Sequence, residues 1–196
     1  MKRIIIALLA LACSVMAEPH AHDGFFMNYA FGAGYQDFDI AYKKGYDLEI
    51  SGVSTEFDLK IGLSINPHII VHLSLISVDN PNDIEVSTDD GDVLVGGGDG
   101  VSSILLGVGV THYMVNNIFF TASVGAVQLG TSEEAQFDFK DGEHGLGFEA
   151  GIGKEIWISD NLGLGLELSL TYVRCAEHGI KNSGLGLNLL LSLTYN

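Results

Sequence analysis

Strict alternation between apolar residues and small or polar residues runs through much of the chain after residue 24. In residues 162–172, every second position holds a leucine from Leu162 to Leu170 and then Tyr172, and mostly glycine, serine and threonine stand between them. Residues 53–66 and 185–195 repeat the pattern. Successive side chains of a β-strand point to opposite faces, so a period of two predicts strands with one apolar face. The chain is therefore expected to fold mainly as β-sheet.

Eight segments carry this alternation, at residues 25–35, 53–66, 68–78, 101–113, 118–130, 145–158, 162–172 and 185–195. The connections between them fall into two alternating classes. Short ones, rich in the Asn, Asp and Pro that tight turns favour, lie at residues 66–67, 115–117 and 160–161. Longer ones lie at residues 36–52, 79–100, 131–144 and 176–184. This arrangement is typical of an up-and-down transmembrane barrel with both termini on the short-turn side.

The composition of the two faces distinguishes a membrane barrel from a soluble sheet. The apolar face carries long side chains with almost no charge, as contact with lipid requires, whereas the other face is mostly glycine, serine and threonine. Small residues suit the lumen of an eight-stranded barrel, which is only wide enough for its own side chains. A tilted strand needs about 9 to 11 residues to cross a bilayer, and the segments are long enough. We therefore predict an all-β fold: an eight-stranded antiparallel up-and-down transmembrane β-barrel with short periplasmic turns and long extracellular loops.

The first residues have the pattern of an export signal. Two basic residues, Lys2 and Arg3, precede an apolar run of residues 4–12, and the small residue Ala17 suits a cleavage site. The apolar run is shorter than the roughly 20 residues of a membrane-spanning helix. The predicted location is the outer membrane of a bacterium. The expected organisation is a signal peptide, a short periplasmic leader and the barrel domain, at residues 1–17, 18–24 and 25–196.

Acidic residues greatly outnumber basic ones, with 25 Asp and Glu against 9 Lys and Arg. This balance excludes a nucleic-acid partner, because phosphate binding needs a basic surface. Most of the acids fall in the long connections, where carboxylate oxygens suit Ca2+ or Mg2+. Residues 89–92 lack the spacing of an EF-hand, so a solvated acidic surface and diffuse cation binding both remain open, and no cofactor is expected. The acids that diffuse binding would use are Asp79, Asp83, Glu85, Asp89, Asp90 and Asp92.

Several charged residues fall on the predicted inward face of the strands: Glu56, Asp58, Lys60, His72, Glu149, Glu155 and Glu167. Buried charges must be paired or change their protonation, and Lys60 is the one lysine of this set. We expect Lys60 to pair with one or more of the carboxylates and the set to close the lumen as a polar plug; a path for protons or ions is the alternative. Lys154 instead falls on the apolar face, where either a β-bulge shifts the register or the side chain reaches the membrane interface.

Residues 153–168, Gly-Lys-Glu-Ile-Trp-Ile-Ser-Asp-Asn-Leu-Gly-Leu-Gly-Leu-Glu-Leu, have the pattern of strand, turn and strand. With this segment and the arrangement of strands, residues 25–196 resemble the small outer-membrane β-barrel proteins of the OmpA and OmpX type and the porin-like β-barrel domains. The resemblance implies contact with outer-membrane lipids and lipopolysaccharide, and insertion by the barrel-assembly machinery. That machinery usually reads a C-terminal aromatic residue, whereas here Tyr195 is penultimate and Asn196 is last.

No residue pattern matches a catalytic motif, so no catalytic residue is assigned. The predicted function is that of a non-enzymatic outer-membrane barrel with a plugged polar lumen and acidic surface loops, in a structural or surface-interaction role. A narrow channel or a small hydrophobic-ligand conduit is the first alternative. The second is a lipid A-modifying barrel enzyme, for which the candidates would be His144 and His178, with Ser132 and Glu143 as neighbours.

Overall fold

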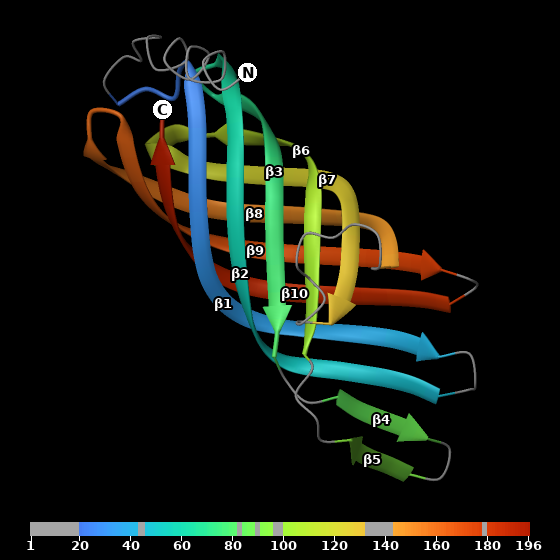
Figure 1. Ribbon diagram of the computed structural model, residues 1–196. Coiled ribbons are helices and arrows are strands. Elements are labelled where there is room, and N and C mark those ends of the chain that lie inside the picture. Colours follow the sequence, from blue (N-terminus) through green and yellow to red (C-terminus); the bar gives the residue numbers. More distant parts are fainter. Residues whose placement is uncertain are drawn as a thin grey trace, which may run out of the picture.

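A computed structural model describes residues 20–42, 46–81, 84–88, 91–95, 100–131, 143–177 and 180–196. Long strands make up nearly all of this part of the chain (Figure 1). They are β1 (Phe25–Tyr42), β2 (Tyr46–Asn66), β3 (Ile69–Asn80), β6 (Val101–Tyr113), β7 (Ile118–Thr131), β8 (Glu143–Ser159), β9 (Leu162–Glu177) and β10 (Ile180–Tyr195). Two short strands, β4 (Ile84–Thr88) and β5 (Gly91–Val95), form a hairpin. No helix in the described residues is long and apolar enough to cross a membrane.

The eight long strands of the described chain close into one antiparallel barrel. Each of the eight long strands pairs with the next long strand along the chain, so that β3 pairs with β6 across the β4–β5 hairpin. β1 pairs with both β2 and β10, which closes the barrel. The closing pairs run along β1 from Met27 to Ile40. This arrangement confirms the predicted up-and-down barrel. The hairpin lies outside the barrel wall, where β4 pairs with β2.

The apolar face of the strands points away from the barrel axis. On β10, Leu187, Leu189 and Leu191 are 51%, 58% and 56% exposed, whereas Asn188 and Ser192 on the opposite face are each 1% exposed. The leucines therefore form an outer surface that suits acyl chains, and the small and polar residues fill the lumen. The prediction for the two faces is confirmed.

Tight turns gather at one end of the barrel, which we call the turn end. The Asn66 side chain accepts hydrogen bonds from the backbone N–H groups of His68 and Ile69, at 2.9 and 3.0 Å, and so shapes the β2–β3 turn. The β6–β7 turn is a single 3₁₀ turn, η1 (Val115–Asn117), in which Asn116 has a φ of 65°. Asparagine tolerates this left-handed conformation better than most residues. β1 begins and β10 ends at the turn end, and we call the opposite end the loop end (Figure 1).

Two of the predicted long loops, residues 36–52 and 176–184, are instead mostly strand. β1 and β2 stay paired up to Tyr42 and Tyr46. β9 and β10 stay paired up to the residues on either side of positions 178–179. The sequence does not reveal these extensions because the two faces exchange character there. On β1 and β2 the inward residues Phe38 and Ile50 are apolar and buried, whereas Asp37 and Asp39 lie on the outward face.

The other two predicted loops differ from each other. Residues 79–100 contain the β4–β5 hairpin, which extends the sheet from β2 through pairs such as Leu48 with Val86. Residues 132–142 lie outside the described residues.

The register of β8 is continuous at Lys154. β8 pairs with β9 without a shift from Gly145 to Trp157, and a bulge comes only after Trp157. Lys154 is exposed on the outer wall beside Ile118, the first residue of β7 at the turn end. The structure therefore favours a side chain that reaches the membrane interface over a shifted register.

Three layers of side chains fill the lumen. The layer nearest the turn end is apolar and contains Phe26, Ile70, Tyr113 and Phe119. The charged residues of the strands occupy the middle. A second apolar layer, towards the loop end, contains Phe38, Ile50, Ile76, Val78, Val101, Leu105, Val127, Leu129, Val173 and Cys175. The lumen thus contains two apolar clusters beside the predicted polar residues, and buried polar side chains such as Gln36, Asn80 and Asn182 accompany the cluster towards the loop end.

Candidate functional site

The middle of the lumen, which we call the charged layer, contains all seven residues that the sequence placed on the inward face. They come from β2, β3, β8 and β9. Because side chains two residues apart share a face of a strand, the run Glu56, Asp58 and Lys60 lines the lumen from β2 alone. Each of the seven is at most 4% exposed: Glu56, Asp58, Lys60, His72, Glu149, Glu155 and Glu167.

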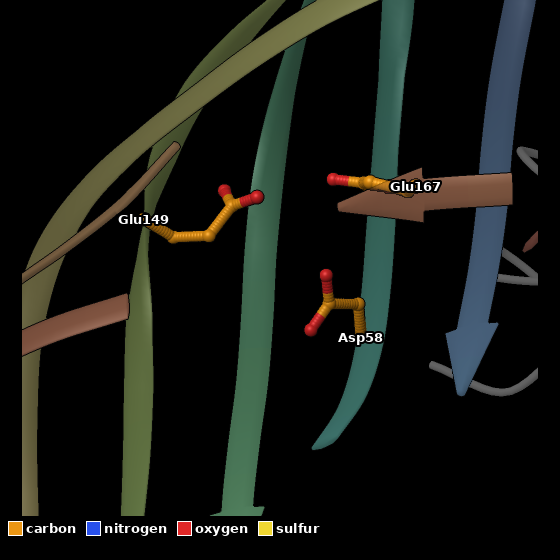
Figure 2. Close-up of side chains that lie close together, drawn as sticks. All are labelled: Asp58, Glu149 and Glu167. Carbon is orange, nitrogen blue, oxygen red and sulfur yellow. The ribbon is translucent and has the colours of Figure 1, made fainter. Parts of the chain in front are cut away.

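An ion cluster around Lys60 joins strands on different sides of the barrel. The Lys60 Nζ atom lies 3.1 Å from Asp58 Oδ2, 3.2 Å from Glu149 Oε1 and 3.3 Å from Glu167 Oε1. Figure 2 shows these three carboxyl groups extending from β2, β8 and β9 into a common space. β2 is not a neighbour of β8 or β9 in the sheet, so the contacts of Lys60 with Glu149 and Glu167 cross the lumen.

Glu56 forms a separate hydrogen-bonded group beside this cluster. Its carboxylate accepts a hydrogen bond from the Ser169 hydroxyl at 2.7 Å and another from the Asn188 side-chain amide. The side-chain carbonyl oxygen of Asn188 in turn accepts a hydrogen bond from the Ser54 hydroxyl at 3.0 Å. These bonds tie β2 to β9 and β10. The sequence signal for Asn188 is an amide in the central part of an inward row of mostly small residues on β10.

His72 and Glu155 take no part in the Lys60 cluster. The two ring nitrogens of His72 lie 2.9 Å from the Ser74 hydroxyl and 3.1 Å from the Thr111 hydroxyl. Glu155 accepts a hydrogen bond of 3.3 Å from the hydroxyl of Tyr113, in the apolar layer near the turn end. The seven residues are therefore one ion cluster of four and three separately bonded side chains.

The charge of the cluster is unbalanced, since three carboxyl groups surround one ammonium group. One oxygen from each of Asp58, Glu149 and Glu167 lies within 4.8 Å of the others, a spacing that could hold a metal ion. The Lys60 ammonium group already lies among these oxygens, so the cluster fits a tethered cation better than a metal. Removal of the lysine would leave buried carboxylates without a partner, which is far costlier than the net worth of an intact pair.

The residues proposed for other chemistry are mostly outside the described part of the chain. Among the six acids proposed for cation binding, the structure describes only the Asp79 side chain, which accepts a hydrogen bond from the Ser102 hydroxyl. Diffuse cation binding therefore stays a prediction. Among the candidates for lipid A chemistry, His144 is exposed on β8 and pairs with Gln128. The described side chains do not include Ser132, Glu143 and His178.

No known family model and no curated protein sequence matches the chain. Solved structures do match. Neisserial surface protein A has a TM-score of 0.51 at 12% identity, over 88% of this chain and 99% of that protein. The outer membrane protein OprG from Pseudomonas aeruginosa has a TM-score of 0.49 at 11% identity, over 90% and 97%. The outer membrane protease OmpT from Escherichia coli has a TM-score of 0.47 at 9% identity, over 93% and 99%.

The likeness to Neisserial surface protein A is one of fold, because only 12% of the aligned residues are identical. The chain has the fold of the small eight-stranded outer-membrane β-barrels. This fold, together with the outward row of leucines, supports placement in the bacterial outer membrane.

Proposed function

We propose that this protein is a non-enzymatic outer-membrane barrel whose lumen is closed, and that it acts as a structural or surface-interaction protein of the envelope. The observation that carries the proposal is the Lys60 ion cluster, which joins β2 to β8 and β9 across the lumen. Two short contacts across the lumen, from Lys60 to Glu149 and to Glu167, leave little room for a column of water.

The packing around the cluster supports a closed lumen. The cavity beside Lys60 and Glu167 has a volume of about 10 Å3, about the least that one water molecule needs. Apolar side chains lie on both sides of the charged layer, and they include Phe119 towards the turn end and Ile76 towards the loop end. Hydrated ions would have to shed water to pass such layers, which favours a plug over a channel.

Partners are expected at two surfaces. The outward leucine rows would contact outer-membrane lipids and lipopolysaccharide, and the barrel-assembly machinery would insert the chain. The acidic connections at the loop end would attract divalent cations, since carboxylate oxygens are their preferred ligands. A role at the cell surface would therefore be carried out by the acidic connections at the loop end. A structural role in the envelope would depend on the outward leucine rows of the barrel wall.

Conductance of the purified protein in planar lipid bilayers tests the closed lumen. The proposal predicts no discrete conductance steps from the wild-type barrel. Reproducible steps of uniform size would contradict it and favour the alternative of a narrow channel.

Incubation with lipid A, followed by mass spectrometry of the lipid, tests the enzyme alternative. The proposal predicts an unchanged lipid mass. A mass change that His144→Ala or His178→Ala abolishes would show that the barrel is a lipid A-modifying enzyme.

A further inference from the structure

Residues 20–24, which we call the strap, are bound across the turn end of the barrel. The backbone N–H of His20 donates to the backbone carbonyl of Asp160, at 2.9 Å, in the β8–β9 turn. Ser64, near the end of β2, donates from its N–H to the carbonyl of Gly24 and from its hydroxyl to the carbonyl of His22, both at 2.9 Å. The strap is therefore attached to the β8–β9 turn and to the end of β2, although it has no periodic pattern in the sequence.

The His22 side chain covers the apolar layer at this end. It is only 5% exposed. Its ring stacks on that of Tyr113 with 3.4 Å between centroids and 15° between planes, and the Trp157 ring lies 4.8 Å away. Tyr113 belongs to the apolar layer with Phe26 and Phe119, so His22 closes that layer from the turn end.

Tyr113 connects this cover to the charged layer. Its hydroxyl donates to Glu155, and its ring lines the small cavity whose other walls include Lys60 and Glu167. Release of His22 would therefore expose Tyr113, which lines this cavity, to the turn end.

The groups that face His22 are few. His68 of the β2–β3 turn and Asp23 of the strap are the ionisable residues near the ring, and Tyr113 is the titratable residue of β6 that stacks on it. The neutral amides of Asn117 and Asn196 also lie near the ring, although neither ring nitrogen makes a hydrogen bond within the described part of the chain. Glu155 of β8 faces the other end of Tyr113, and Asp160 meets the strap through its backbone.

Burial lowers the pKa of His22 from its ordinary 6.5 to about 4, and the charge of His68 adds to this, whereas the two asparagines and Asp23 oppose it. A histidine whose pKa is lowered in the bound state is held there in its neutral form. The free strap therefore binds the proton more tightly, so binding of the strap is strongest above pH 6.5 and weakens as the pH falls towards 4. A pKa difference of this size changes the binding constant of the strap by a factor of at most about 300.

We propose that residues 20–24 form an acid-released strap that closes the turn end of the barrel, with His22 as its proton sensor. At neutral pH the uncharged imidazole covers Tyr113. In acid, the imidazolium leaves the aromatic surface for water, and the ring of Tyr113 becomes accessible. Placement in the outer membrane puts the turn end in the periplasm, so the signal would be periplasmic acid.

Trp157 is the one tryptophan of the chain and lies beside His22, so its fluorescence reports on the strap. The experiment measures acrylamide quenching of Trp157 from pH 8 to pH 4 in the processed protein, purified from outer membranes into detergent micelles. Quenching is expected to be weak at pH 8 and to rise with a midpoint between pH 6.5 and 4. Heat-modifiable gel migration at each pH checks that the barrel stays folded.

Variants separate the strap from other titrating groups. His22→Phe keeps an aromatic ring that cannot titrate, so quenching should stay weak at every pH. The matched control His112→Gln removes an exposed histidine near the same end, outside the strap, and should keep the transition. Deletion of residues 18–24 should leave the fluorescence of Trp157 strongly quenched by acrylamide at every pH from 8 to 4.

Four results would overturn the proposal. The first is pH-independent quenching of Trp157 in the wild type, and the second is a pH transition that survives in His22→Phe. The third is a deletion variant whose Trp157 is quenched by acrylamide at pH 8 as weakly as in the wild type. The fourth is loss of heat-modifiable migration over the same pH range. The first would mean that attraction between the imidazolium and the aromatic rings offsets its loss of hydration. The last would assign the transition to unfolding of the barrel.

Discussion

The charged layer and the apolar layer near the loop end fill the same lumen with opposite chemistry. In the charged layer, the Lys60 ammonium group contacts three carboxyl groups at 3.1 to 3.3 Å. Each charged group therefore depends on a partner held at a fixed position. In the apolar layer, side chains such as Ile76 and Leu105 are at most 3% exposed and pack against one another. Loss of one side chain leaves an uncompensated charge in the first layer and only a cavity in the second. The charged layer therefore fixes which strands face each other, and the apolar layer excludes water.

Lys60→Met is expected to have the largest effect. It removes the cation and leaves Asp58, Glu149 and Glu167 buried around a methionine, at a cost of about 3 to 5 kcal/mol in the free energy of unfolding. Urea titration in lipid vesicles, with heat-modifiable gel migration as the readout, measures the loss. Neutralising the three acids in the same variant, as Asp58→Asn, Glu149→Gln and Glu167→Gln, should restore most of it. Unchanged stability of Lys60→Met would remove the distinction between the two layers.

Ile76→Ala tests the apolar layer and is expected to cost about 2 to 4 kcal/mol, because it leaves a cavity among packed side chains. The milder change Ile76→Val should cost about 1 kcal/mol, so the loss is graded with the volume removed. The same urea titration measures both variants. Equal losses for the two would mean that the layer responds to something other than packing.

Glu56→Gln sharpens the comparison within the charged layer. Glu56 is bonded to Ser169 and Asn188, not to Lys60, and a glutamine oxygen can still accept one of these bonds while the serine hydroxyl turns to accept from the new amide. We expect a loss of about 1 kcal/mol. A loss in the free energy of unfolding as large as that of Lys60→Met would show that Glu56 contributes to stability as much as the members of the ion cluster do.

Lys154→Met should have the smallest effect. Lys154 is also a strand lysine, but it is exposed on the outer wall near the turn end. Its removal should change the free energy of unfolding by less than about 0.5 kcal/mol. A larger loss would show that lysines on the two faces of the wall matter equally to stability.

The sequence predicted the barrel because the alternating residues match two environments, lipid on the outside and packed side chains on the inside. It placed Lys60 and the six other residues of the charged layer on the inward face for the same reason. It could not say which carboxylates Lys60 reaches, because contacts across the lumen depend on strand tilt and stagger, which no local pattern encodes. It missed the strand extensions that end at Tyr42 and Tyr46, because there the inward face becomes apolar, as at Phe38 and Ile50, and the pattern of the central segments is lost. It also missed the bound His22, which lies outside every periodic segment.

A double-mutant cycle between Lys60 and Glu149 tests the central claim most directly, because the two residues belong to β2 and β8 and meet only across the lumen. The cycle compares the unfolding free energies of the wild type, Lys60→Met, Glu149→Gln and the double variant. A coupling of about 1.5 kcal/mol or more is expected if the charged layer joins opposite walls. A coupling below about 0.5 kcal/mol would contradict that account.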